Sequence, residues 1–218
     1  MHSAVSWAGE TLHLLPEHAI SWPRGGALFV ADLHIGKAAA YRAQGQPVPR
    51  GTTATNLRRL DELIARHAPR DLVVLGDFLH DATAQQANVA SALASWRGRH
   101  PLLAITVVRG NHDARAGALP QHLAIVTVDE PHLLGPFACC HEPRQHPSHF
   151  VLAGHVHPVC MLLGSGRDRL RLPCFVEDRE GAILPSFGAF TGGWQVRPSP
   201  GRRLHVVGDG QVWTLPRA

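Results

Sequence analysis

The stretch Ile105-Thr106-Val107-Val108-Arg109-Gly110-Asn111-His112-Asp113 joins a short, mainly apolar run to four residues that can carry chemistry. The run has the length of a strand buried on both faces of a sheet, and it shows no helical periodicity. The Gly-Asn-His-Asp tetrapeptide then places an amide, an imidazole and a carboxylate where that strand ends. We therefore expect a functional site at the end of a buried strand.

Four further segments have the same form, an apolar run of strand length that ends at a side chain able to bind a metal. They are residues 28–32, ending at Asp32; 72–77, ending at Asp77; 137–141, ending at His141; and 150–155, ending at His155. In open α/β sheets, functional groups collect beyond the carboxyl ends of the strands. We expect these side chains, far apart in the sequence, to converge on one crevice.

Helical patterns separate the first three of these runs. Residues 52–67 place three leucines and an isoleucine on one face, and the alanine-rich residues 83–96 repeat apolar side chains at helical spacing. The first half is therefore predicted to be β-α-β-α-β. After Pro120 the pattern becomes β-like, at residues 123–128, 170–176, 203–207 and 212–215. The expected class is α/β, with two packed sheets flanked by helices in one domain covering residues 1–218.

The composition is that of an ordinary folded protein, with 44% hydrophobic and 17% charged residues among 218. Apolar runs are too short to span a bilayer, and the first twenty residues lack the pattern of a signal or transit peptide. We therefore expect a cytoplasmic protein with no membrane association. The four cysteines, Cys139, Cys140, Cys160 and Cys174, show no C-x-x-C spacing and are expected to be reduced.

Basic residues exceed acidic ones by 21 to 17, and Lys37 is the only lysine. Arginine suits bidentate phosphate contacts, although a codon bias explains its dominance equally well. The arginine cluster at residues 167–171, together with Arg202 and Arg203, is compatible with a nucleic acid backbone. Its interleaved acid, Asp168, favours a solvated surface instead.

The chemistry of the strand-end residues favours a pair of metal ions. Residues two apart in an extended chain share a face, so the pairs Asp32/His34 and His155/His157 are each expected to point the same way. Imidazole nitrogens with carboxylate and amide oxygens suit Mn²⁺, Fe²⁺ or Zn²⁺ better than Mg²⁺ or Ca²⁺. A shared carboxylate, expected from Asp77, lets two divalent ions approach to roughly 3.5 Å. Manganese is the first expectation on grounds of availability.

Five motifs in this order resemble those of the calcineurin-like metallophosphoesterase superfamily. They are Asp32-Leu33-His34, Gly76-Asp77, Gly110-Asn111-His112-Asp113, His141 and Gly154-His155-Val156-His157. The resemblance implies a four-layer α-β-β-α sandwich over nearly the whole chain. It also implies that one metal takes Asp32, His34, Asp77 and His157, and that the other takes Asp77, Asn111, His141 and His155. His112 is then a general acid for the leaving oxygen, with Asp113 orienting its ring.

Longer stretches, at residues 30–37, 75–80, 140–143 and 184–193, are similar to the bacterial DNA ligase-associated phosphoesterase family, called PdeM. That family is linked to DNA repair together with a helicase, an exonuclease and an ATP-dependent ligase. The resemblance implies a metal-dependent phosphodiesterase that acts on DNA, with endonuclease action expected first and exonuclease action left open. His80 resembles a histidine that helps to position the phosphate in related nucleases.

Lys37, Arg109 and Arg144 are expected to contact substrate phosphate, although a solvated surface position explains either arginine equally well. Two other functions compete with a DNA phosphodiesterase. One is a phosphatase or phosphodiesterase for small nucleotides or lipid-linked phosphates, which a metal site alone does not exclude. The other is a non-catalytic scaffold on the same fold, which is disfavoured because no ligand position is eroded.

Overall fold

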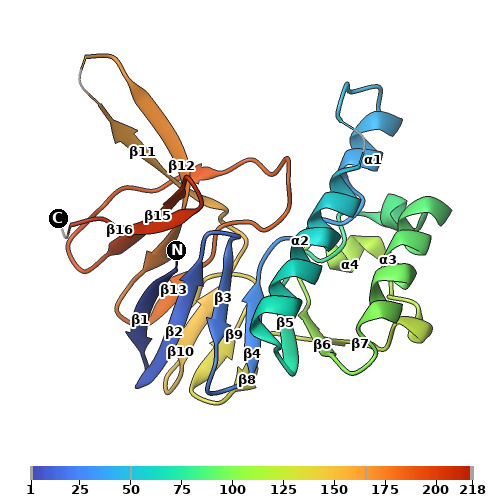
Figure 1. Ribbon diagram of the computed structural model, residues 1–218, viewed down its shortest axis with the longest axis horizontal. Helices are drawn as coiled ribbons and strands as arrows, with labels where there is room; N and C mark the ends of the chain where they lie inside the picture. Colours follow the sequence, from blue (N-terminus) through green and yellow to red (C-terminus); the bar gives the residue numbers. More distant parts are fainter. Residues whose placement is uncertain (1, 50, 165, 217–218) are drawn as a thin grey trace.

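The computed structural model describes residues 2–49, 51–164 and 166–216, and within these ranges its first sheet has seven strands. They follow the order of the chain: β1 (Ser3–Trp7), β2 (Glu10–Leu15), β3 (Ala19–Trp22), β4 (Ala27–Val30), β5 (Asp71–Leu75), β6 (Ala104–Val108) and β7 (Ile125–Val128). β1 to β4 pair antiparallel, and β4 to β7 pair parallel. The carboxyl ends of β4, β5 and β6 therefore meet at one edge (Figure 1).

The second sheet contains nine strands within the same described ranges. They are β8 (His132–Leu134), β9 (Phe137–Cys139), β10 (Phe150–Ala153), β11 (Pro158–Leu163), β12 (Arg169–Glu177), β13 (Gly181–Ile183), β14 (Trp194–Gln195), β15 (Arg203–Gly208) and β16 (Gln211–Thr214). β10 runs parallel to both β9 and β13. The β11–β12 hairpin projects beyond the sheet as an arm (Figure 1).

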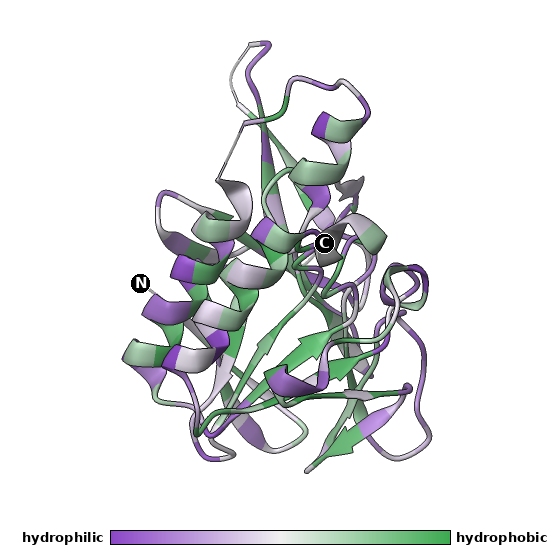
Figure 2. Ribbon diagram, turned by 90° about the vertical axis from the view of Figure 1, so that its right-hand side faces the viewer, coloured by the Kyte–Doolittle hydropathy of each residue, from purple (hydrophilic) through white to green (hydrophobic). Residues whose placement is uncertain are grey.

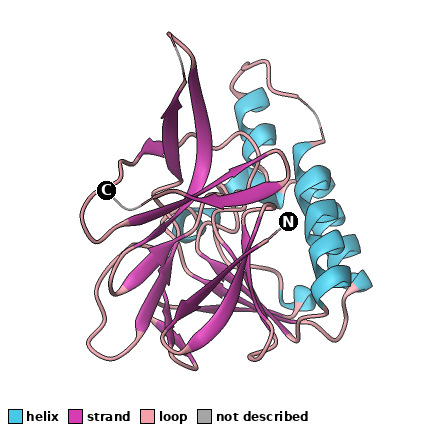
Figure 3. Cartoon of the chain, turned by 60° about the vertical axis from the view of Figure 1, so that its left-hand side comes forward, coloured by secondary structure: helices cyan, strands magenta, loops and turns pink. Residues whose placement is uncertain are grey.

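Helices cover the outer face of the first sheet and gather on one side of the molecule (Figure 3). They are α1 (Lys37–Ala43), α2 (Thr52–His67), η1 (Ala82–Gln85), α3 (Ala87–Arg99), α4 (Asp113–Ala116) and η2 (Gln121–Leu123). Leu60 of α2 and Trp96 of α3 are fully buried against strand residues such as Leu28 and Val74. Burial of each such side chain contributes roughly 1.5–3 kcal/mol to the stability of the fold, and this packing holds the helices against the sheet.

The core between the two sheets is apolar and rich in aromatic rings. Phe137 of the second sheet meets Trp22 edge-on at 5.1 Å and Phe29 at 6.1 Å, measured between ring centroids. The Trp22 indole N–H donates to Glu10 Oε2 at 2.9 Å, and this hydrogen bond offsets the cost of removing the N–H from water. The hydropathy colouring of Figure 2 follows this arrangement, with the strands green through the centre. This packing fixes the two sheets, and hence the loops at their ends, relative to each other.

The α/β class with two packed sheets is confirmed, as are the five apolar runs, which form β4, β5, β6, β9 and β10. The helix over residues 52–67 is confirmed as α2. The helix expected over residues 83–96 differs, because the chain first makes the short turn η1, capped by the Asp81 carboxylate. Gln86 then adopts an extended ψ of 144°, and α3 begins only after it. The three N-terminal strands, β1 to β3, were not predicted from the sequence.

The outer layer on the second sheet differs from the four-layer expectation. In the part of the chain that the structure describes, no helix follows Leu123, so loops cover this face instead. Val151 and Ala153 are buried there with Ala138 and Cys140. Above them, Pro143 and Pro200 line a cavity of about 670 Å³. The layer order is therefore helices, sheet, sheet and loops.

None of the helices in the described ranges is long and apolar enough to cross a membrane. All four cysteines are buried and free of disulfides, as expected. Burial raises the pKa of the Cys139 and Cys174 thiols to about 12, so both stay protonated.

We predict that His18 makes the fold sensitive to acid. Its Nδ1 donates to Ser186 O at 2.7 Å, and burial lowers its pKa from 6.5 to about 4. The unfolded chain therefore binds the additional proton between these pH values, and the free energy of unfolding falls as the pH drops through that window. His18→Asn keeps an amide donor and tolerates the left-handed φ of 64°. Between pH 7 and pH 4, the free energy of unfolding of this variant should fall by about 2 kcal/mol less than that of the wild-type protein, measured by urea unfolding. Identical pH profiles for the two proteins would contradict the assignment.

Candidate metal centre

Loops at the carboxyl ends of five strands bring the expected ligands together. Asp32, Asp77 and Asn111 follow β4, β5 and β6 of the first sheet, whereas His141 and His155 follow β9 and β10 of the second. Backbone hydrogen bonds tie these loops together, with Asp32 N donating to Gly76 O at 3.1 Å and Gly154 N donating to His141 O at 3.0 Å. The site thus lies where the two sheets meet, and each sheet supplies part of it.

One group of side chains matches the first expected metal position. The Nε2 atoms of His34 and His157 lie 3.4 Å apart, and His157 Nε2 lies 3.4 Å from Asp32 Oδ1. Asp77 Oδ2 lies 3.8 Å from His34 Nε2. His157 Nδ1 donates to Gly192 O at 3.2 Å, which leaves the Nε2 lone pair directed into the group. These four donors can close around one cation.

A second group matches the other expected position and shares Asp77 with the first. His141 Nε2 lies 3.0 Å from Asn111 Oδ1, 3.0 Å from His155 Nδ1 and 3.6 Å from Asp77 Oδ1. The two Asp77 oxygens therefore face different groups. This is the placement that a bridging carboxylate needs.

The electrostatics of the centre fit divalent cations. Asp32 is fully buried and Asp77 is 3% exposed, and one oxygen of each lies within 4.8 Å of the other and of His141. Two such carboxylates repel each other in a low dielectric unless cations neutralise them. Burial, together with the nearby Lys37 charge, lowers the pKa of His34 to about 2. The ring is therefore neutral, which is the form that binds a metal.

The backbone at the ligands differs from the expectation of extended pairs. Five ligands adopt a left-handed φ: Asp32 (54°), His34 (47°), Asp77 (49°), His155 (69°) and His157 (48°). The members of each i, i+2 pair therefore converge because the chain curls around the centre, not because an extended strand aligns them. Asp and His tolerate this region better than most residues, but each still costs about 1 kcal/mol or more.

Three glycines of the motifs make room for the ligands. A Cβ atom on Gly76 would lie 2.1 Å from His141 Nδ1, one on Gly110 would lie 2.2 Å from Asp77 Oδ1, and one on Gly154 would lie 2.7 Å from Asp32 Oδ2. Each glycine thus packs against a ligand from another loop. The Gly-Asp, Gly-Asn and Gly-His pairs are explained by this close approach, because any side chain would displace a ligand.

His112 lies beside the centre in a defined tautomer. Its backbone N–H donates to Asp77 Oδ1 at 2.9 Å, and its Nδ1 donates to the His80 carbonyl oxygen at 2.6 Å. Since the carbonyl only accepts, Nδ1 carries a proton and Nε2 is the atom left for chemistry. Asp113 had been expected to orient this ring, but its carboxylate has other partners. Its carboxylate instead accepts from Leu79 N and Gly110 N, so it joins two of the ligand loops.

His80 packs between two other histidines and the α1 helix. Its ring stacks on His112 with centroids 4.7 Å apart, and its Nδ1 lies 3.4 Å from His34 Nδ1. Because His34 Nε2 faces the metal group, His34 Nδ1 is the donor and His80 Nδ1 the acceptor. Burial lowers the pKa of His80 to about 4, with the neighbouring His112 and Lys37 adding to the shift. His80 therefore supports the orientation of both His34 and His112.

The three expected substrate contacts fall into different environments. Lys37 is 9% exposed, and burial lowers its pKa, although electrostatic interaction with Asp32 and Asp77 offsets part of the shift. Arg109 instead pairs with Asp129 at 3.3 Å. Arg144 pairs with Glu130, whose other oxygen accepts from His141 N at 2.6 Å. The structure therefore brings Lys37 to the site but shows both arginines in ion pairs.

The segment Leu184–Phe190 supports the Asp32 loop, a role that the sequence analysis did not foresee. Ser186 Oγ and Gly188 N both donate to Asp32 O, at 2.9 and 3.0 Å. From α2, Arg59 donates to Phe187 O and lies 3.9 Å over the Phe187 ring, and Asn56 Oδ1 accepts from Ala189 N. One signal was available: Asn56 is a polar residue on the apolar face of α2, next to Leu57 and four residues before Leu60.

Comparison with known proteins agrees with this architecture. The family model described as calcineurin-like phosphoesterase matches residues 27–138. The chain belongs to the calcineurin-like phosphoesterase family. It is therefore a phosphoester hydrolase, of a family that binds two metal ions, and the side-chain groups described above are candidate ligands. The matched range ends before His141, so the last three ligands are placed by the geometry alone.

The solved structures that are similar to this chain include the following two. The crystal structure of Pseudomonas putida nuclease MPE is 48% identical, with a TM-score of 0.86, and the match covers 99% of this chain and 100% of that one. YfcE, a phosphoesterase from E. coli, is 17% identical with a TM-score of 0.39, covering 84% of this chain and 88% of that one. A search of curated proteins found no match.

We predict that Gly76→Ala weakens metal binding more than it weakens the fold. The new Cβ would force the His141 ring away, and alanine is strained at a φ of 77°. Binding of Mn²⁺, followed by calorimetry, should fall by at least tenfold at one of the two positions.

Gly98→Ala is the matched control, because Gly98 lies in α3 and a Cβ there meets nothing within 4 Å. This variant should bind Mn²⁺ like the wild-type protein and gain roughly 0.5–1 kcal/mol of stability. Full Mn²⁺ binding by Gly76→Ala would contradict the packing argument.

Proposed function

We propose that this calcineurin-like phosphoesterase is a dinuclear metal-dependent phosphodiesterase that cleaves DNA. The observation that carries the proposal is the convergence of Asp32, Asp77 and Asn111 from one sheet with three histidines from the other around two adjoining positions. Similarity to a nuclease over 99% of the chain supports a nucleic acid substrate. Endonuclease action is the form we propose first.

Manganese is the metal that we propose for both positions. Histidine nitrogens mixed with carboxylate and amide oxygens make a borderline site, which also accepts Fe²⁺ or Zn²⁺. Mg²⁺ and Ca²⁺ prefer oxygen ligands throughout. Two bound ions would supply Lewis-acid activation of the phosphate and of the attacking water.

The surrounding residues hold and protonate the substrate. His112, fixed through Nδ1 to His80 O, presents Nε2 to the leaving oxygen and donates a proton from that atom when the ring is cationic. The Lys37 ammonium, which interacts electrostatically with Asp32 and Asp77, neutralises a non-bridging phosphate oxygen in this proposal. His80 supports His34 and His112, and Asp113 fixes the Gly110 loop. Contacts of Arg109 and Arg144 with substrate remain a prediction, since both are paired with acids.

A role in DNA repair belongs to this proposal and rests on the resemblance to the ligase-associated phosphoesterases. The expected functional partners are an ATP-dependent ligase, a helicase and an exonuclease, and a cytoplasmic location agrees with a DNA substrate. Absence of such genes near this one would weaken the proposal.

The competing function is hydrolysis of small nucleotides or lipid-linked phosphates. Labelled DNA, a nucleotide panel and bis-p-nitrophenyl phosphate, each assayed with Mn²⁺, would separate the two. Intact DNA beside rapid turnover of a nucleotide would overturn our choice.

We predict that His112→Ala and Asp77→Asn fail in different ways. His112→Ala should retain both Mn²⁺ ions yet lose roughly 10²–10⁴-fold in turnover of bis-p-nitrophenyl phosphate, since the acid is gone and the ligands remain. Asp77→Asn should lose turnover together with at least one ion, because the bridging charge is removed. Metal content is measured on the same preparations.

His122→Ala serves as the control, since His122 is exposed on η2 and lies outside the centre. Its turnover and metal content should match those of the wild-type protein. Full turnover by His112→Ala would remove this histidine from the mechanism.

A further inference from the structure

A cavity of about 300 Å³ adjoins the metal centre and has no role in the mechanism described so far. Its lining includes the ligand His157, together with Phe190 and Gly192 from the segment after β13 and Arg171 from β12. The hydrogen bond from His157 Nδ1 to Gly192 O lies in its wall. Whatever occupies this cavity is therefore next to His157, one of the candidate metal ligands.

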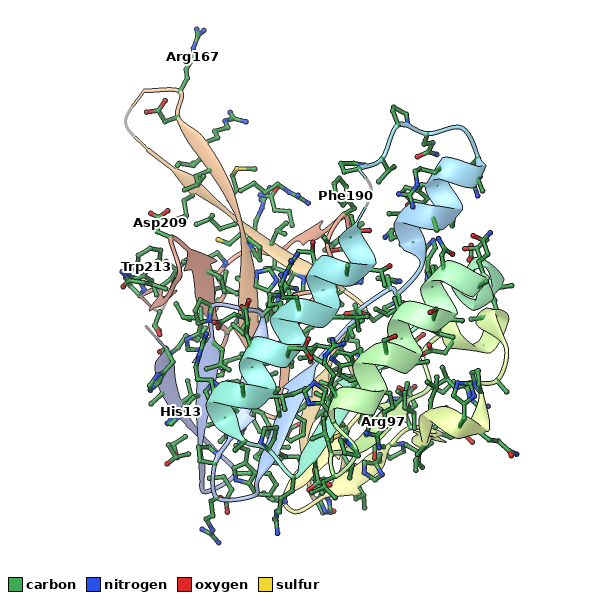
Figure 4. The ribbon with its side chains drawn as sticks, turned by 45° about the vertical axis from the view of Figure 1, so that its right-hand side comes forward. His13, Arg97, Arg167, Phe190, Asp209 and Trp213 are labelled. Carbon is green, nitrogen blue, oxygen red and sulfur yellow. The ribbon has the colours of Figure 1, made fainter. Side chains whose placement is uncertain are left out.

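Phe190 is held in an unusual way at this cavity. The residue is 51% exposed, and its backbone has a left-handed φ of 59°, which a bulky residue rarely adopts. The neighbouring backbone is fixed, because Ala189 N donates to Asn56 Oδ1 and Thr191 Oγ1 donates to Gly188 O at 3.0 Å. Figure 4 shows Phe190 between the β11–β12 arm and α1. A strained backbone that presents an aromatic ring to solvent points to a ligand for that ring.

Positive charge continues from the cavity along the arm. Arg171 is exposed, and its Nη2 donates to Gly193 O at 2.6 Å, which fixes the guanidinium at the cavity wall. Arg169 lies two residues away on the same strand and therefore on the same face. Arg167 lies at the tip of the arm (Figure 4). This row of cations leads away from the metal centre.

We propose that the cavity binds the nucleoside next to the scissile phosphate, with Phe190 stacked on the nucleobase and Arg171 paired with the adjacent phosphate. The inference rests on the proposed DNA phosphodiesterase function and adds its substrate contacts. A flat apolar face, a fixed guanidinium and a neighbouring phosphate site match the base, backbone and reacting group of one nucleotide. The volume is at the small end of ligand sites, which suits one nucleoside.

The stacking contact is tested with two phosphodiesters that differ in the nucleoside alone. They are the p-nitrophenyl ester of thymidine 5′-monophosphate and methyl p-nitrophenyl phosphate, both assayed with the Mn²⁺-loaded full chain. The wild-type protein should favour the thymidine ester in kcat/KM. Phe190→Leu should reduce that preference about tenfold, through KM, because leucine is apolar but cannot stack. Phe190→Tyr should preserve it.

Trp213→Leu is the matched control, since Trp213 is an exposed aromatic residue of β16 outside the cavity lining. Its preference for the thymidine ester should equal that of the wild-type protein. An unchanged preference in Phe190→Leu, or an equal loss on both esters, would overturn the stacking contact.

The phosphate contact is tested through salt dependence. Arg171→Gln keeps a donor for Gly193 O but removes the charge. For an oligothymidylate of ten nucleotides, the slope of log KM against log salt concentration should fall by about one in this variant. The same slope as in the wild-type protein would overturn the role of Arg171.

Failure of the proposed function gives a different pattern from failure of this inference. If the wild-type protein hydrolyses neither ester, the proposed function is wrong. Binding of a nucleotide then tests whether the cavity is a nucleoside site. Trp194 is 74% exposed and two residues from Gly192, so the part of the tryptophan fluorescence that is lost in Trp194→Phe is a reporter of the cavity. Thymidine 5′-monophosphate should quench it with a Kd about tenfold weaker in Phe190→Leu, whereas inorganic phosphate should show no such difference. Equal values of Kd for the nucleotide would exclude the site.

Discussion

The repulsion between the Asp32 and Asp77 carboxylates is the constraint on which the rest of the structure depends. Both groups are buried at the junction of the two sheets, and the main-chain amides of His155 and His112 donate to them. Such amides carry only partial charge, so they offset part of the repulsion and leave the remainder to metal ions. His34, whose pKa burial lowers to about 2, is a neutral candidate ligand for those ions and adds no further charge. The two buried carboxylates thus account both for the local structure of the centre and for its need of metal ions.

Backbone strain at the ligands is the cost of this arrangement. Five left-handed residues within one site are tolerable only because the surrounding packing fixes them from several directions. The carbonyl of Asp32 accepts two hydrogen bonds from the segment after β13, and α2 holds that segment through Asn56 and Arg59. The glycines that press against ligand atoms belong to the same system. Precision at the metals therefore rests on residues that never touch them.

The sequence predicted the parts of the fold that depend on local patterns. Apolar runs ending in polar side chains located five of the strands, and leucines at helical spacing located α2. The prediction that Asp113 orients the His112 ring was wrong, because a sequence cannot reveal that the Leu79 and Gly110 backbone amides donate to its carboxylate. The extended geometry assumed for the Asp32 and His34 pair failed because contacts between distant loops override local preference. The ion pairs of Arg109 and Arg144 could not be predicted, since their acidic partners, Asp129 and Glu130, lie in the loop between β7 and β8, which carries no recognisable motif.

The division of the ligands between the two sheets also determines when the centre can form. Asp32, Asp77 and Asn111 are made early in synthesis, but the second position lacks two of its donors until β9 and β10 have paired and packed against the first sheet. Contacts of such long sequence separation form late in folding. A partly synthesised or partly folded chain therefore offers only an incomplete set of ligands. The full set of candidate metal ligands is present only when the whole core is assembled, so metal binding and phosphoester hydrolysis both depend on complete folding.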